Sequence, residues 1–193
     1  MWRRAVFVLW WAMCSLGVQA QQVVEGVRFE RDTVVQGQSL VLNGAGLRAM
    51  MIIKVYAAGL YLPQVAKTAP QALSAAGAKR VRIVMLRNVS AQRLAGNLLS
   101  GVQETTPTTA ETQALAPRLE TLRQSMLTVG EVLRGQDIAL DYVPGEGTRV
   151  SVDGRLLGDP IPGADFYAAL LRIWLSDDAA DQGLRRELLG LPD

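Results

Sequence analysis

The stretch LNGAGLRAMMIIKVYAAGLYLP, residues 42–63, decides the fold of this chain. Its residues 50–62 are apolar on both faces apart from Lys54, which is typical of a central strand covered on both sides. A buried helix is the alternative, because the alanines and leucines of the run suit a helix. Gly59 and the proline that ends the stretch favour a strand. We therefore predict β-structure over residues 39–62.

Outside this stretch, the hydrophobic periodicity predicts helices, one further strand and a hairpin. Pro70 opens a short helix, Ser90 is an expected N-cap, and Pro144-Gly145-Glu146-Gly147 is typical of a hairpin turn. The expected helices are residues 68–77, 91–104, 110–129, 163–175 and 181–190, and the expected strands are 79–87, 137–143 and 148–152. This order predicts an α+β fold.

The first twenty residues have the three parts of a signal peptide. Arg3 and Arg4 precede an apolar run of about 14 residues, which is shorter than the roughly 20 needed to span a bilayer. The segment ends in a small-x-small sequence at Ala20. We predict cleavage after Ala20 and a periplasmic or secreted protein; an uncleaved membrane anchor is the alternative.

Removal of the leader limits the chemistry available to the mature chain. The single cysteine, Cys14, leaves with it, and the sequence has no histidine. Disulfides, thiol nucleophiles, Ser-His-Asp triads and zinc sites built on Cys or His are therefore excluded. We expect no metal and no cofactor. Loss of two arginines lowers the lysine and arginine count from 20 to 18, equal to the 18 acidic residues, which gives no support for nucleic acid or an anionic membrane as partner.

The mature chain is expected to form one domain, residues 21–193. It contains no internal repeat and no low-complexity linker. Its length is sufficient for a substantial hydrophobic core.

Five segments of the sequence resemble the chalcone isomerase-like family, in particular its bacterial exported branch. They are LNGAGLR (42–48), KVYAAGLYLP (54–63), KRVRIVMLRNVSAQRL (79–94), DYVPGEGTRVSVDG (141–154) and FYAALLRIWLSDDAADQGLRRELLG (166–190). The resemblance spans residues 26–191. It implies an open-faced β-sandwich, in which a curved antiparallel sheet is covered by helices on one face.

The resemblance also implies two possible uses of the fold. Isomerases of the family rely on an arginine in the GxR segment, a threonine on the next strand, and a tyrosine and an asparagine on a helix. Relatives without the full set bind fatty acids, and the arginine takes the carboxylate. Arg48 matches the arginine position and Tyr56 the threonine position. The helix tyrosine falls near Arg93 or Leu94 and the asparagine near Ser100 or Gly101, so neither is retained.

The candidate ligand-binding residues are Arg48, Lys54, Tyr56 and Asn97. If the strand runs straight, one face carries Arg48, Met50, Ile52, Lys54 and Tyr56, which places two cations and a phenol along an apolar groove. A guanidinium in such a groove can bind a carboxylate or phenolate. Alternatively, Arg48 pairs with a structural carboxylate or faces water. Tyr61 has the opposite parity and is expected in the core.

These residues favour a non-catalytic binder of a small amphipathic anion, such as a fatty acid, near Arg48. The alternatives are an isomerase or intramolecular lyase in which Arg48 and Tyr56 give electrostatic help, and an interaction module of the cell envelope. The expected partner is a small amphipathic ligand. No nucleic acid and no stable membrane span after cleavage are expected.

Overall fold

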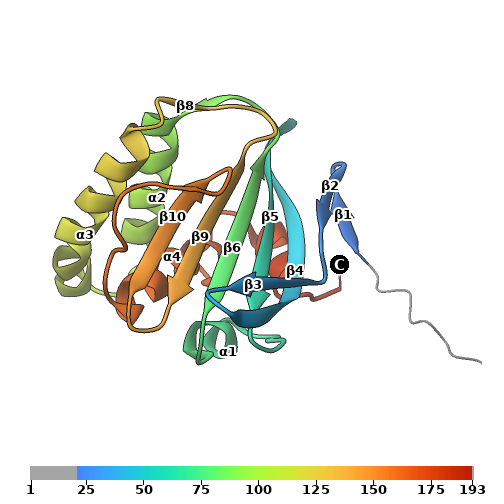
Figure 1. Cartoon of the computed structure of the whole chain (residues 1–193), viewed down its shortest axis with the longest axis horizontal. Coiled ribbons are helices and arrows are strands. Elements are labelled where there is room, and N and C mark those ends of the chain that lie inside the picture. Colours follow the sequence, from blue (N-terminus) through green and yellow to red (C-terminus); the bar gives the residue numbers. More distant parts are fainter. Residues whose placement is uncertain (1–20, 193) are drawn as a thin grey trace, which may run out of the picture.

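Residues 42–62 belong to two long antiparallel strands joined by a tight turn. In the computed structural model, which describes residues 21–192, they belong to a seven-stranded sheet in which all neighbours are antiparallel (Figure 1). From one edge to the other the strands are β11 (Arg155–Leu156), β10 (Gly147–Val152), β9 (Asp137–Val143), β6 (Lys79–Met85), β5 (Ile53–Leu62), β4 (Gln38–Met50) and β3 (Asp32–Val35). The predicted central strand is β5, whose residues 57–62 are all buried.

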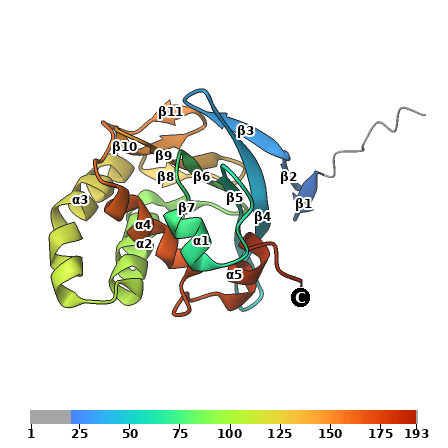
Figure 2. The same ribbon diagram turned by 90° about the horizontal axis from the view of Figure 1, so that it is seen from below.

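The helices of residues 21–192, five in number, lie on one side of the arched sheet (Figure 2). They are α1 (Ala69–Ser74), α2 (Ala91–Thr105), α3 (Thr109–Leu127), α4 (Ala164–Leu175) and α5 (Gln182–Leu188). Their apolar stripes and the facing side chains of the sheet form the main core. The α+β fold with a curved antiparallel sheet covered by helices is confirmed.

Side-chain N-caps explain where four of these helices begin. The side chains of Thr68, Ser90, Thr108 and Asp181 accept hydrogen bonds from the backbone N–H three residues later, at the starts of α1, α2, α3 and α5. Such caps satisfy an N–H group that has no partner within the helix. The local sequence therefore fixes where α1, α2, α3 and α5 begin, whereas α4 begins after Gly163 without a side-chain cap.

The expectation that residues 50–62 form one straight strand is wrong. The chain reverses at Met51 and Ile52, and Met51 has a positive φ of 55°. Turn sequences are usually polar, whereas this one is entirely apolar. The hydrophobic pattern alone therefore does not distinguish a hairpin from a continuous strand here.

The opposite face of the sheet carries a second, smaller core that the sequence analysis did not predict. A hairpin of β1 (Gln22–Val24) and β2 (Val27–Phe29) places Phe29 against this face, where Tyr61 is also buried, as expected for its parity. A Cβ at Gly59 would lie 2.6 Å from the Phe29 ring, so glycine permits this contact. A short pair, β7 (Val89–Ser90) and β8 (Glu131–Val132), closes one end of the helix layer.

Helix α5 packs directly on β4 because glycines leave room for it. A Cβ at Gly44 would lie 2.1 Å from the backbone oxygen of Glu187, and the space above Gly46 is filled by the Glu187 side chain. The Glu187 carboxylate accepts the Leu47 N–H at 3.0 Å. These contacts bring the start of α5 close to Arg48.

The predicted leader, residues 1–20, lies outside the described residues. Within residues 21–192, no helix combines the length and hydrophobicity required to cross a membrane.

Candidate functional site

A pocket of about 300 Å³ lies between the sheet and the helices α2 and α4. This volume is at the lower end of the range typical of small-molecule sites. Its apolar wall is formed by Val55, Ile83, Val89, Leu94, Leu98, Ile138 and Ile173. Polar lining residues that are exposed, and therefore stand at the mouth, are Arg87, Arg93, Asn97, Ser100 and Glu104. The pocket can accommodate an apolar tail and offers charged groups to a polar head.

Arg48 and Tyr56 both line this pocket, and they are cross-strand neighbours rather than residues of one strand. Side chains directly opposite each other on antiparallel strands share a face and lie within contact range. The prediction that the two residues face the same way is therefore correct, although the geometry that brings them together is a hairpin.

Lys54 does not share that face. Arg48 pairs with Tyr56 and Ala49 pairs with Lys54, so Val55 is an extra residue on β5, which is a β-bulge. The bulge interrupts the alternation, and Val55 and Tyr56 both line the pocket. The Lys54 ammonium instead binds the Glu25 carboxylate at 2.5 Å. This corrects the expected row of five side chains on one face.

Arg48 has a carboxylate partner from a distant part of the sequence. Its Nη1 donates to Oδ2 of Asp181 at 2.9 Å, and about a quarter of each side chain is exposed. The other oxygen of Asp181 caps α5 by accepting the Leu184 N–H at 3.0 Å. One of the five guanidinium N–H groups is used in this pair. Arg48 therefore pairs with a structural carboxylate, which was the alternative expectation, and it also lines the pocket; its role as a ligand-binding residue stays a prediction.

The Tyr56 hydroxyl is fixed by a tryptophan. Trp174 Nε1 donates to the Tyr56 oxygen at 2.9 Å, which leaves the phenolic hydrogen free to bond elsewhere. Burial raises the pKa of Tyr56, against the opposing effects of the Trp174 hydrogen bond and the charge of Arg48. The phenol is therefore neutral at neutral pH and can donate a hydrogen bond to a ligand.

Helix α2 carries Asn97 at the pocket mouth, where its side chain is exposed. The helix also approaches α4 closely, because a Cβ at Gly101 would lie 3.0 Å from the Ile173 side chain. The wall of the pocket is thus formed by two helices in direct contact.

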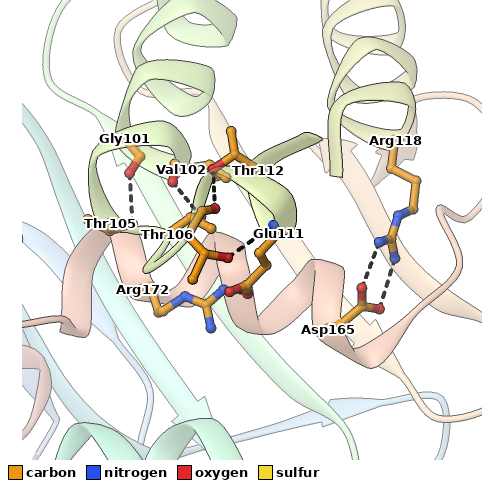
Figure 3. A network of polar contacts seen from close by, with 10 residues as sticks. Gly101, Val102, Thr105, Thr106, Glu111, Thr112, Arg118, Asp165 and Arg172 are labelled. Carbon is orange, nitrogen blue, oxygen red and sulfur yellow. Dashed lines mark hydrogen bonds and ion pairs between the residues drawn. The ribbon is translucent and has the colours of Figure 1, made fainter. Parts of the chain in front are cut away.

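Ion pairs hold this helix layer together at the far end of α2 (Figure 3). Glu111, in the first turn of α3, pairs with Arg172 of α4. Arg118 of α3 forms two bonds with the Asp165 carboxylate, at 2.8 and 2.6 Å. A planar fork of this kind restrains orientation as well as distance. The arrangement joins α3 to α4 at two points.

Four polar residues at the pocket were not among the predicted site residues: Arg87, Arg93 and Trp174, which line it, and Asp181, which pairs with Arg48. Arg87 ends the expected strand 79–87, and Arg93 lies at the start of the expected helix 91–104. Two arginines so close together in the sequence were a signal from which a cationic site could have been predicted. Asp181 lies 133 residues from Arg48, and no local pattern connects the two.

The arched antiparallel sheet, its one-sided helix layer and the apolar pocket between them define a class of α+β proteins with a cavity between sheet and helices. Comparison with known proteins identifies the family. Residues 21–190 match the model of the chalcone isomerase-like family, and the chain belongs to that family.

A solved relative supports the same fold. The chain is similar to the crystal structure of an Arabidopsis thaliana fatty-acid binding protein, with a TM-score of 0.71 and 16% sequence identity. The likeness covers 88% of this chain and 96% of the plant protein. No curated protein matches this chain.

Proposed function

We propose that this protein binds a small amphipathic anion of the fatty-acid type in the pocket beside Arg48 and does not convert it. The observation that carries the proposal is the pairing of Arg48 with Tyr56 across two strands at the wall of an apolar pocket. A guanidinium and a neutral phenol can both donate to one carboxylate, while the aliphatic tail is removed from water along the apolar wall. The similarity to a plant fatty-acid binding protein supports this ligand class.

The site offers little for acid–base catalysis. Burial keeps the Tyr56 phenol protonated, so it is not a base at neutral pH. Glu104 is the carboxylate among the lining residues and stands exposed at the mouth. A general base needs a tuned pKa and a position within reach of the proton it removes. We therefore expect no acceleration of chalcone cyclisation above the spontaneous rate, and stereoselective turnover would contradict a purely binding role.

We further propose that the protein is exported and that its leader is removed. The two arginines, the short apolar run and the small residue at Ala20 support this, and the family match begins at the next residue. Mass spectrometry of the protein from a periplasmic fraction should give a chain beginning at Gln21. A chain that retains Met1 in the membrane fraction would contradict export with cleavage.

The binding proposal is tested by displacement of a dansyl-labelled fatty acid followed by fluorescence. Arg48→Ala should weaken carboxylate binding by about 1.5 kcal/mol, the net value of a hydrogen bond to a charged group, or about tenfold. It should leave the affinity for the corresponding methyl ester almost unchanged.

Arg118→Ala is the matched control. Arg118 also pairs with an aspartate and its side chain is also 24% exposed, but it does not line the pocket. Equal losses in the two variants, or equal losses for acid and ester, would contradict a role for Arg48 in binding the anion.

A further inference from the structure

The turn between β4 and β5 presents four consecutive apolar side chains to solvent. Met50, Met51, Ile52 and Ile53 are 58%, 99%, 95% and 47% exposed. Single exposed apolar residues are normal on protein surfaces, but a run of four at a turn is not. We call residues 50–53 the hairpin tip. Nothing in the fold requires these side chains to be apolar, because they support neither core.

The hairpin tip adjoins the mouth of the pocket. Met50 belongs to the tip and also lines the pocket. The segment that follows β6 is joined to β5 by a hydrogen bond from the Leu86 N–H to the Val55 carbonyl at 3.0 Å. A surface that covers the tip therefore also lies against the opening through which a ligand enters.

Three arginines lie at this end of the sheet, and two of them, Arg87 and Arg93, line the pocket together with Met50. Arg87 follows β6, and Arg93 stands in the first turn of α2. Arg134 follows β8 and precedes Gly135, whose N–H donates to the Met85 carbonyl at the end of β6 at 2.8 Å. The Arg134 N–H donates to the Asn88 side chain at 2.9 Å, which confirms that these segments adjoin (Figure 1). Within residues 21–192, these three arginines form no ion pair.

Two acidic groups near the tip are held in ion pairs, Glu25 with Lys54 and Asp181 with Arg48. Glu131 of β8 is exposed, and so is Asp178 in the loop between α4 and α5, which lines the pocket through Ala180. Glu104 lies on α2 about 16 Å from Arg93, given a rise of about 1.5 Å per residue. The neutral balance of the mature chain thus conceals three arginines that have no ion-pair partner among residues 21–192.

We propose that the hairpin tip and its three arginines dock the protein on an anionic lipid bilayer, with the pocket mouth facing the membrane. Apolar side chains at a projecting turn can enter the boundary between headgroups and acyl chains, while flanking arginines contact lipid phosphates. A bilayer accepts a convex projection, whereas a protein partner needs a groove shaped to receive it. The combination of an apolar tip with unpaired cations favours the anionic bilayer.

This inference goes beyond the proposed function. Only the role assigned to the membrane-facing mouth, which is to admit a ligand, rests on the proposed function. A lipid-derived anion that partitions into the bilayer would reach the pocket without crossing water. Docking itself is tested without any such ligand, so the two proposals fail separately.

The test is flotation of residues 21–193, which contain every described element and both cores, with phospholipid vesicles. Binding should be stronger to vesicles that contain phosphatidylglycerol than to pure phosphatidylcholine, and should weaken as salt rises. The double variant Met51→Ser, Ile52→Ser should bind about a hundredfold more weakly, at about tenfold for each side chain withdrawn from the bilayer. Replacement of Arg87 or Arg134 by alanine should cost about fivefold on anionic vesicles only.

Val34→Ser is the matched control, because Val34 is an exposed apolar residue (60%) on β3, away from the pocket. It should bind vesicles as the unmodified chain does. The tip variant should still bind the dansyl-labelled fatty acid in solution, since neither Met51 nor Ile52 lines the pocket. The bilayer proposal would be overturned if the protein did not float with vesicles, or if Val34→Ser lost as much binding as the tip variant. It would also be overturned if the protein were a dimer that the tip variant converts to a monomer, because this result would assign the tip to a protein interface.

Discussion

Replacement of Asp181 by asparagine separates the two tasks of this side chain. One oxygen caps α5 by accepting the Leu184 N–H, and the other accepts from Arg48. Asparagine is as good an N-cap as aspartate, so the helix start should persist. The negative charge beside Arg48 disappears, and a bound carboxylate no longer competes with it for the guanidinium.

The size of the effect follows from the geometry. Two carboxylates held by one guanidinium are about 6 Å apart, and their repulsion is about 1 to 3 kcal/mol for an effective dielectric constant of roughly 50 to 20. Because about a quarter of both side chains is exposed, the lower value applies. Asp181→Asn should therefore tighten binding of a fatty acid by about 1 kcal/mol, or about fivefold.

The assay is displacement of the dansyl-labelled fatty acid, carried out with a free acid and with its methyl ester. The gain should be seen with the acid, be reduced at high salt, and be absent with the ester. Thermal denaturation checks that the cap survives. Unchanged or weaker binding of the acid by a variant of normal stability would refute the claim that Arg48 receives the ligand carboxylate.

Two further predictions concern the fold. Gly44→Ala should lower the free energy of unfolding by about 2 kcal/mol, because the added Cβ would meet the backbone of α5. Gly96→Ala is the control: its Cβ would lie in open space on α2, so the variant should be neutral or slightly stabilised. Thermal melts of both variants check this. Burial raises the pKa of Tyr56, Tyr61 and Tyr167, so their stabilising contribution is complete below the unfolded pKa of about 10 and is lost as pH rises above it. Denaturant titrations at increasing pH should show falling stability, and tyrosinate absorbance from these residues that precedes unfolding would contradict the prediction.

Much of the fold could be predicted because alternation and helical periodicity directly reflect burial. The strand at residues 79–85 alternates its apolar side chains as expected, and the helix stripe of α3 is buried at Leu115, Leu119, Leu122 and Met126. The turn at residues 51–52 was missed because its side chains are apolar. The three N-terminal strands are short and half-exposed, so they carry a weak pattern.

The part of the site that could be predicted from the sequence is the part that lies within one β-hairpin. Arg48 and Tyr56 share a pocket, as expected, because residues near one another in a β-hairpin are also near one another in space. A bulge at Val55 moved Lys54 away, and periodicity alone does not reveal where a strand gains an unpaired residue. The Asp181 partner depends on the packing of α5 against β4, which is a property of the tertiary structure.

In the Arg48–Asp181 pair, a carboxylate of the chain itself competes with any free anion for the Arg48 guanidinium. Asp181 belongs to the same chain, so its effective concentration at Arg48 does not fall when the protein is diluted. Small free anions, which bring only a charge, must displace it with no other gain. A ligand with an aliphatic tail adds the burial of that tail, so under the proposed function we expect the resident carboxylate to make the pocket discriminate for amphipathic anions over simple salts.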